Sequence, residues 1–356
     1  MTQDQTRTST ATIIQRLVEK GDFLHLCREQ PTLFSKPIHF MLSQHTNVQV
    51  IAEGIIYFEP LDVTNKDIVL SCGIHGNETA PIEICDDLTR DILVGNIVVK
   101  QRVLVIFGNL PAMDIAQRFV TENMNRLFSG EHKNVTEAQL VNDERRRASQ
   151  LEEAVKQFYY GRDNKQQSSR YHYDLHTAIR PSKNQKFAVY PFQNGKPWDK
   201  RQLQILLACG VNTILLSGNP TTTFSYYSAN EFAAHAFTVE LGKVQPFGQN
   251  NMADFYEVID TLTKMVCGNE LELKDYDPAD FLIYEVNQVI NKHHADFVLN
   301  FADDMPNFSD FAKGEVLATE TGAIYKAEHD GEAIVFPNAG VEIGQRAILT
   351  VIPTTI

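Results

Sequence analysis

Gly73-Ile74-His75-Gly76-Asn77-Glu78-Thr79-Ala80-Pro81-Ile82-Glu83 is the stretch that decides how this chain folds. The residues before it, Asp67 to Cys72, form a largely apolar run that predicts a buried strand. Apolar residues then recur at helical spacing from Ile82 to Leu93. We therefore expect His75 and Glu78 at a strand-to-helix turn, which is where α/β proteins place their ligands.

A histidine and a glutamate three residues apart can both reach one metal ion. Imidazole nitrogen and carboxylate oxygen are normal zinc ligands, and a catalytic zinc takes three protein ligands and a water molecule. The alternative is a helix-capping turn that carries a surface His75 and Glu78, since short motifs also match by chance. The rest of the chain has to decide between the two.

The composition excludes several classes of protein. With 356 residues, 43% of them hydrophobic and 22% charged, the chain is long enough for one large or two ordinary globular domains. Its net charge of −13 argues against a nucleic-acid-binding surface. The same charge means that an anionic substrate would need a local basic pocket.

Features of secreted and membrane proteins are missing from the sequence. The five cysteines are scattered and form no C-x-x-C pair, which favours free thiols in a reducing compartment. The polar segment Met1 to Lys20 has no signal-peptide core, and no apolar run reaches the ~18 residues of a membrane span. We expect a cytoplasmic protein with a small-molecule partner.

A second strand, Arg102 to Asn109, follows the predicted helix and completes a parallel α/β unit. The polar segment Ala116 to Gly130 then contains Arg118 and Arg126, which could fork a substrate carboxylate. The alternative is two surface arginines. Asn142 to Tyr160 predicts a helix, in which the run Glu144-Arg145-Arg146-Arg147 is interpreted as a solvated face.

The segment Tyr171-His172-Tyr173-Asp174-Leu175-His176-Thr177 predicts a strand with His172, Asp174 and His176 on one side. His176 lies at the expected strand end and is the candidate third zinc ligand. Asp174 could orient one of the metal ligands by accepting a hydrogen bond from it, without binding the metal itself. His172 is the weaker candidate and is interpreted as a half-buried core histidine.

Further along, one acidic residue stands in an apolar strand. Strands are predicted at 187–190 and 211–216 with a helix at 198–209 between them, and 221–227 is predicted as a polar, aromatic loop. Glu240 lies near the end of the apolar run Ala236 to Gly242, where a lone carboxylate is costly to bury unless it is paired or functional. It suits a general base.

The pattern of apolar runs and turn residues changes after a predicted helix at 258–265. Short apolar runs separated by Gly, Pro and Asp/Asn turns predict a small β-rich domain. We predict a partly helical N-terminal extension over 1–47, a zinc-dependent catalytic α/β domain over 48–268 and a β-rich domain over 269–356. The predicted fold is α/β, with a mixed, mostly parallel central sheet flanked by helices.

Together these pieces are what metal-assisted hydrolysis of an amide needs, since zinc polarises the carbonyl and a glutamate moves the proton. Four segments resemble the succinylglutamate desuccinylases, in the aspartoacylase-like branch of the zinc carboxypeptidase family. They are Gly73 to Pro81, Asn123-Met124-Asn125-Arg126-Leu127-Phe128, Asp174 to Arg180, and Val239-Glu240-Leu241-Gly242-Lys243. The resemblance covers Ile68 to about Gly248 by motif, and it implies a zinc carboxypeptidase-like fold.

The resemblance also implies roles and a reaction. One zinc ion per chain would bind to His75, Glu78 and His176, and Glu240 would be the general base. Arg118 would polarise the carbonyl. Asn125 and Arg126 would bind the substrate carboxylate. The implied reaction is hydrolysis of N-succinyl-L-glutamate to succinate and L-glutamate, the last step of arginine catabolism by the succinyltransferase pathway.

One departure leaves the acyl specificity open. The aspartoacylase relatives carry an arginine ten residues before the catalytic glutamate, and Asn230 stands there in this chain. In those relatives the arginine anchors a substrate carboxylate. Either another cation of this chain, Lys243 or Arg180, holds that carboxylate, or the substrate is another N-acyl amino acid such as N-acetylaspartate. A catalytically silent protein of the same fold is a third hypothesis, but it predicts the loss of a ligand or of the base, and all are present.

Overall fold

The computed structural model describes residues 9–62, 64–135, 142–161 and 168–356. The chain divides into two compact units. The first consists of Met1–His176, Thr221–Ala236 and Gln245–Glu272, and the second of Thr177–Pro220, Phe237–Val244 and Leu273–Ile356. Residues 1–8 of the predicted N-terminal extension lie outside the described residues, and the predicted domain boundaries stay a prediction.

Six strands of the first unit form a mixed sheet in the order β1-β2-β3-β5-β4-β6. They are β1 (Ile38–Leu42), β2 (Thr46–Ala52), β3 (Ile55–Pro60), β4 (Lys66–Cys72), β5 (Arg102–Phe107) and β6 (Ser169–Ala178). β4 runs parallel to both β5 and β6, whereas the other neighbours are antiparallel. Cys72 lies beside Leu175, so the turn after β4 and His176 reach the same edge of the sheet.

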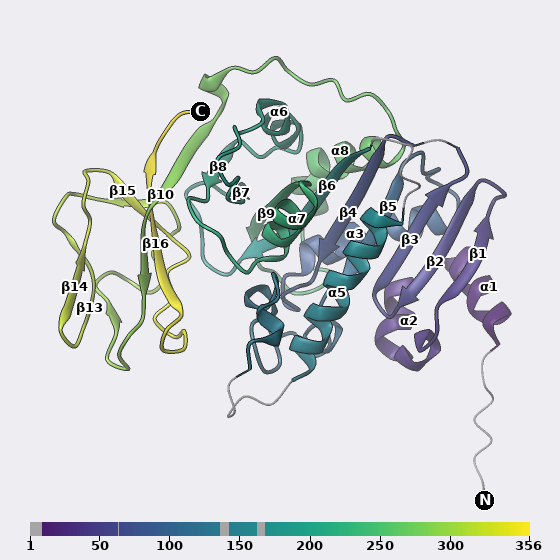
Figure 1. The fold of residues 1–356 in the computed structure, drawn as a ribbon, viewed down its shortest axis with the longest axis horizontal. Helices are drawn as coiled ribbons and strands as arrows, with labels where there is room; N and C mark the ends of the chain where they lie inside the picture. The colour runs from purple at the N-terminus through teal and green to yellow at the C-terminus, as the bar shows by residue number, and fades with distance from the viewer. Residues whose placement is uncertain (1–8, 63, 136–141, 162–167) are drawn as a thin grey trace, which may run out of the picture. The chain divides into compact units, whose positions relative to one another are not determined.

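Helices cover both faces of these strands. The helices are α1 (Thr10–Lys20), α2 (Phe23–Glu29), α3 (Thr79–Leu93), α4 (Leu110–Asp114), α5 (Asp143–Tyr160), α7 (Phe224–Phe232) and α8 (Tyr256–Val266), with short 3-10 turns at Pro31–Phe34, Met124–Arg126, Glu131–Lys133 and Met252–Phe255. α5 and α7 share one apolar cluster with Val69, Leu104 and Ile106, and Figure 1 shows α5 lying along these strands. α3 contacts β4 and β5 without joining that cluster, so it covers the opposite face.

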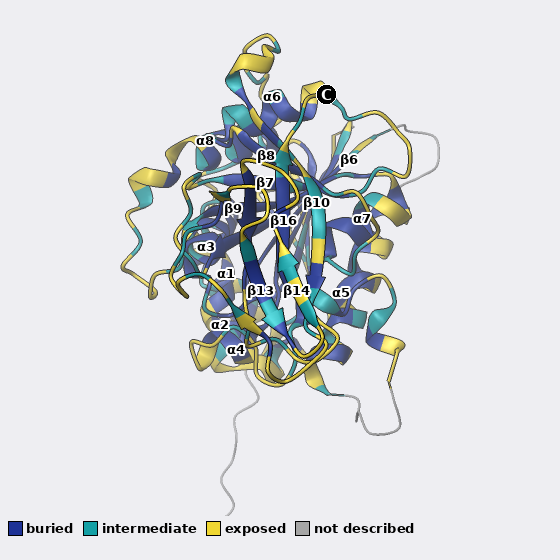
Figure 2. Ribbon diagram, turned by 90° about the vertical axis from the view of Figure 1, so that its left-hand side faces the viewer, coloured by how far each residue is buried: buried dark blue, intermediate teal, exposed yellow. Residues whose placement is uncertain are grey.

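The second unit has strands in the order β9-β7-β8-β10-β16-β15-β12 and a separate sheet β11-β13-β14. Its elements are β7 (Phe187–Tyr190), α6 (Lys200–Ala208), β8 (Thr213–Leu216), β9 (His235–Lys243), a 3-10 turn (Pro278–Asp280), β10 (Leu282–Asn291), β11 (Val298–Leu299), β12 (Ser309–Phe311), β13 (Val316–Glu320), β14 (Ala323–Lys326), β15 (Glu332–Val335) and β16 (Arg346–Pro353). β7, β8 and β10 are parallel, and the later strands are antiparallel. β9 is largely buried, whereas only two of the ten residues of β10 are buried (Figure 2).

The predicted fold class is confirmed: parallel strands at the centre of a mixed sheet, flanking helices, and a β-rich C-terminal part. All five cysteines are free thiols. Within the described ranges, every helix is too short or too polar to cross a bilayer. The predicted loop at 221–227 is wrong in its second half, because α7 begins at Phe224. The Thr223 side chain accepts a hydrogen bond from the Tyr226 N–H and so caps that helix.

The interpretation of the charged run on α5 as a solvated face is also wrong, except for Arg146. Glu144 is 3% exposed and Arg145 is 4% exposed. Arg147 donates hydrogen bonds to the backbone carbonyls of Gly108, Glu53 and Phe107. These side chains tie the helix to the ends of neighbouring elements instead of facing water.

Side chains from the first turns of α5 hydrogen-bond to the segment that carries Arg118 and Asn123 and hold it in place. Glu144 Oε1 accepts the N–H groups of Val120 and Thr121 at 2.7 and 3.1 Å. Arg145 forks the Glu122 carboxylate through Nε at 2.7 Å and Nη2 at 2.6 Å. A forked arginine–carboxylate pair fixes orientation as well as distance, so this segment has a defined place.

A buried ion pair sets the register at the far end of the parallel strands. Asp67 on β4 lies opposite Arg102 on β5 and accepts the Arg102 Nη1–H at 2.9 Å. Asp67 is fully buried and Arg102 is 4% exposed. Arg102 also donates to the Phe158 carbonyl at 2.9 Å and lies over the Phe158 ring at 4.7 Å.

Arg102→Met should lower the free energy of unfolding by about 3–5 kcal/mol, because it leaves the buried Asp67 carboxylate without its cation. Urea unfolding followed by circular dichroism measures the loss. Arg146→Met is the control, since the Arg146 side chain is 61% exposed and should contribute less than about 1 kcal/mol. A loss at Arg102 as small as the control's would contradict the role given to the pair.

Glu144→Ala should free the segment that carries Arg118. The N–H groups of Val120 and Thr121 lose their shared acceptor, at a cost of about 1–3 kcal/mol. Hydrogen exchange measured by NMR should become faster at these two amides. Glu153→Ala, on the same helix with a side chain 52% exposed, should leave both amides unchanged. Equal protection in the two variants would mean that Glu144 does not hold the segment.

Candidate metal centre

The turn between β4 and α3 is built so that its backbone can pass close to α4. Gly73 has φ 63°, a left-handed conformation that glycine adopts without strain. A Cβ at Gly76 would lie 2.2 Å from the backbone carbon of Ala112. Glu78 is the residue before α3, but its side chain makes no capping hydrogen bond to the first turn of that helix, whose residues the structure describes. The helix-capping alternative for this turn is therefore wrong.

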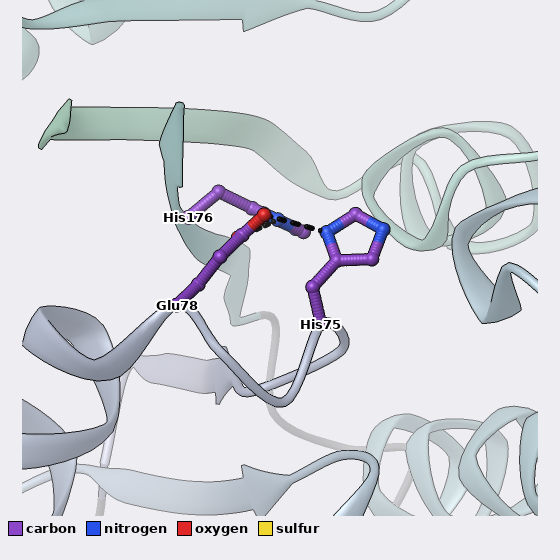
Figure 3. Close-up of side chains that lie close together, drawn as sticks. All are labelled: His75, Glu78 and His176. Carbon is purple, nitrogen blue, oxygen red and sulfur yellow. Dashed lines mark hydrogen bonds and ion pairs between the residues drawn. The ribbon is translucent and has the colours of Figure 1, made fainter. Parts of the chain in front are cut away.

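The structure brings His75, Glu78 and His176 together (Figure 3). Their ligand atoms all lie within 4.8 Å of one another, and each residue is at most 2% exposed. The Nδ1 atom of His75 lies 2.8 Å from Oε1 of Glu78, and Nδ1 of His176 lies 2.8 Å from Oε2. Both imidazoles thus present the same nitrogen to one carboxylate.

The outer nitrogen of each imidazole has an acceptor of its own. Nε2 of His75 lies 2.9 Å from Oδ1 of Asn123, and Nε2 of His176 lies 2.9 Å from Oδ2 of Asp174. An N–H donated outwards at Nε2 leaves the lone pair of a neutral imidazole on Nδ1. Such outward bonds to carboxylate or carbonyl oxygens are typical of metal-binding histidines.

The charges in this cluster compensate each other. Burial alone would raise the pKa of Glu78, but His75, His176 and Arg118 together hold the pKa of this carboxyl well below its usual range. Burial, assisted by the Arg118 charge, lowers the pKa of His75 to about 4. Burial also disfavours the charged form of His176, yet Asp174 and Glu78 raise its pKa well above the usual value.

The three residues fit a zinc ion. Two imidazole nitrogens and one carboxylate form a donor set that zinc prefers in catalytic sites. Among the described residues, Nδ1 of His75 makes no hydrogen bond, although it is buried and close to Glu78. Such an atom needs a partner, and a cation between the three side chains would supply one. In the described ranges this is the sole cluster of its kind.

Arg118, the predicted carbonyl-polarising residue, lies at this cluster, and the two predicted substrate-binding residues, Asn125 and Arg126, lie on the same segment. Arg118 donates to Glu78 Oε1 at 2.6 Å, and its side chain is 30% exposed. Asn125 is buried, and its Oδ1 accepts the Phe224 N–H at the start of α7 at 3.2 Å. Arg126 Nη1 donates to the Asn125 carbonyl at 3.0 Å. Asn125 thus also has a structural task.

Glu240 belongs to the second unit. So do Lys243 and Arg180, the two candidates for the substrate carboxylate that an arginine anchors in the aspartoacylase relatives. Glu240 is on β9, 6% exposed, and lies opposite Phe187 on β7. Lys243 is exposed. Arg180 is partly buried, and its Nη1 is a buried atom with no hydrogen-bond partner among the described residues.

Asn230, in the first unit, is exposed and bonds within its own helix region. It accepts from the Tyr226 hydroxyl at 3.3 Å and donates to Glu231 at 2.8 Å. The Asn230 side-chain amide is therefore hydrogen-bonded to Tyr226 and Glu231, which are close to it in sequence.

Sequence reasoning missed the role of Asn123. It lies outside the predicted ligand set, yet it holds the outer nitrogen of His75. The available signal was its place at the start of the Asn-Met-Asn-Arg segment. That segment supplied two predicted site residues, so its first residue could have been included.

Comparison with known proteins gives matches over nearly the whole chain. Residues 64–266 match the succinylglutamate desuccinylase/aspartoacylase catalytic domain, and residues 279–354 match the AstE/AspA barrel-sandwich hybrid domain. Succinylglutamate desuccinylase from Pseudoalteromonas atlantica is 60% identical, covering 98% of this chain and 99% of the relative. The corresponding protein from Shewanella woodyi is 48% identical, covering 96% and 98%.

Solved structures give the same result. The X-ray structure of the succinylglutamate desuccinylase from Vibrio parahaemolyticus superimposes with a TM-score of 0.82 at 34% identity, covering 94% of this chain and 95% of that one. The catalytic-domain match spans more than half of the sequence and includes all three clustered residues. The chain therefore belongs to the succinylglutamate desuccinylase/aspartoacylase family.

Proposed function

We propose that this protein is a zinc-dependent amidohydrolase that converts N-succinyl-L-glutamate and water to succinate and L-glutamate. The observation that carries the proposal is the buried convergence of His75, Glu78 and His176, with both Nδ1 atoms 2.8 Å from the Glu78 carboxylate. The substrate is proposed because a relative that is 60% identical over nearly the whole chain bears the name succinylglutamate desuccinylase. The arginine-catabolic pathway and the cytoplasmic location remain predictions from the sequence.

The roles of the residues follow from their chemistry. His75, Glu78 and His176 would hold one zinc ion. Zinc in such a site supplies Lewis acidity, which polarises a carbonyl and acidifies water. Glu240 would take the proton of the attacking water and pass it to the leaving nitrogen, as a general base that becomes a general acid.

The proposed binding groups are cationic or polar. Arg118, partly exposed beside Glu78, would donate hydrogen bonds to the substrate carbonyl oxygen as negative charge develops on it. Asn125 and Arg126 would bind a substrate carboxylate, for which the arginine fork is suited. For the second carboxylate Arg180 is the better of the two candidates, because its buried Nη1 lacks a partner among the described residues while Lys243 is exposed.

A second candidate function keeps the chemistry and changes the acyl group. Asn230 stands where the aspartoacylase relatives carry an arginine, and its amide bonds to Tyr226 and Glu231. A neutral amide cannot replace the charge of an arginine on a carboxylate. This observation favours a test on another N-acyl amino acid beside N-succinylglutamate.

Removal of zinc should abolish glutamate release from N-succinylglutamate, and zinc repletion should restore it, since the Lewis acid is lost and regained. Glutamate release from N-succinylglutamate and, in a parallel assay, aspartate release from N-acetylaspartate are followed before chelation, after chelation and after repletion. Restored turnover of N-succinylglutamate supports the proposal. Restored turnover of N-acetylaspartate alone would replace the substrate. Turnover unaffected by complete metal removal would overturn the zinc dependence.

Glu240→Gln should lower kcat by roughly 100-fold or more, because an amide cannot take the proton of the attacking water. Zinc content should be unchanged, since Glu240 is outside the proposed ligand set. Glu285→Gln, on β10 of the same unit, is the control and should leave kcat unchanged. Steady-state kinetics and metal analysis on the same preparations separate the two effects. A Glu240→Gln protein with zinc bound and full turnover would remove Glu240 from the mechanism.

A further inference from the structure

Hydrogen-bonded side chains continue from His176 into the interior of the first unit. His172 on β6 is fully buried, and each of its ring nitrogens faces a serine hydroxyl. Its Nε2 lies 2.8 Å from Ser71 Oγ on β4, and its Nδ1 lies 2.7 Å from Ser228 Oγ on α7. The interpretation of His172 as a half-buried histidine is therefore wrong, because the residue is fully buried and both of its ring nitrogens are hydrogen-bonded.

The direction of the bonds can be worked out from Ser71. Ser71 Oγ donates its single proton to Asp174 Oδ1 at 2.5 Å, since a carboxylate only accepts. The same oxygen must then accept a hydrogen bond from His172. The His172 ring therefore carries its proton on Nε2.

The far side of the His172 ring completes the assignment. Burial lowers the pKa of His172 to about 4, so the ring is neutral at physiological pH. With its proton on Nε2, Nδ1 is an acceptor, and Ser228 donates to it. The ring also stands edge-on against Phe224 at 4.7 Å between centroids. His172 thus has one protonation state and one orientation that satisfy every neighbour.

The consequence reaches the metal site through Asp174. One oxygen of this fully buried carboxylate is held by Ser71, which leaves the other to accept the Nε2–H of His176 at 2.9 Å. When the ring is neutral, as it must be to bind a metal ion, a His176 that donates from Nε2 presents its Nδ1 lone pair towards Glu78, 2.8 Å away.

We propose that His172 is a positioning residue of the metal centre, which acts with Ser71 and Ser228 to fix the Asp174 carboxylate and hence the tautomer and direction of His176. The inference rests on the proposed function, because it needs the metal site at His75, Glu78 and His176. His172 itself touches neither the ligands' metal-facing atoms nor any group that reacts. Its effect is on the affinity for the ion.

Zinc affinity of the whole chain, measured by competition with a chromophoric chelator, tests the proposal. His172→Phe keeps an aromatic ring against Phe224 but offers neither donor nor acceptor, and it should weaken zinc binding roughly tenfold. His172→Gln keeps an N–H donor and a carbonyl acceptor and should recover most of the affinity. Ser71→Ala, which changes little volume, should weaken zinc binding as much as His172→Phe does. If His172→Phe fails to fold, the zinc affinity of Ser71→Ala tests the positioning role in its place.

The control is His132→Phe. His132 is a buried histidine of the same unit whose Nδ1 faces the Leu127 carbonyl at 3.3 Å, so its loss should alter stability but leave zinc affinity at the parent value. In zinc-loaded protein labelled with 15N-histidine, His176 should show a single Nε2–H tautomer in the parent and in His172→Gln, and a broadened or mixed signal in His172→Phe.

The two levels of failure give different results. If the parent chain binds zinc but His172→Phe and Ser71→Ala bind it with parent affinity, the positioning role is wrong and the proposed metal site stands. If the parent binds no zinc, the metal site itself is wrong. A tenfold loss in His132→Phe as well would assign the effect to general loosening and also overturn the positioning role.

Discussion

The burial of the Glu78 carboxylate, in the turn between β4 and α3, is the constraint on which the rest of the site depends. A buried charge is costly unless it is paired and hydrogen-bonded. Two Nδ1 atoms and the Arg118 guanidinium surround it, and they come from the same turn, from β6 and from the segment clamped by α5. The parallel pairing of β4 with β6 and the buried charges of α5 are what deliver these partners.

The parts of the structure that follow local rules could be predicted from the sequence. Apolar periodicity predicted β4, α3, β5 and β6, and the rule that parallel strand ends share one edge predicted that His176 would approach His75 and Glu78. Alternation along β6 placed His172, Asp174 and His176 on one side. The roles of Glu240, Arg118, Asn125 and Arg126 remain predictions, since they depend on a substrate.

The features that could not be predicted from the sequence depend on residues that are far apart in the chain. The run 144–147 has the composition of a solvated face, and it is buried because Glu122, Val120 and the carbonyls near Gly108 are there to meet it. Ser71 reads as an ordinary strand residue until Asp174 and His172 lie beside it. Ser228 lies in a helix that was predicted in part as a loop. Composition cannot distinguish an exposed charge from one whose partner is distant in sequence.

The Asp67–Arg102 pair lies at the opposite end of the strands from the clustered ligands. Strand register and the apolar cluster beneath α5 are thus settled by groups that take no part in holding an ion. An ion bound at the proposed site would therefore not be needed to set the register of β4 against β5.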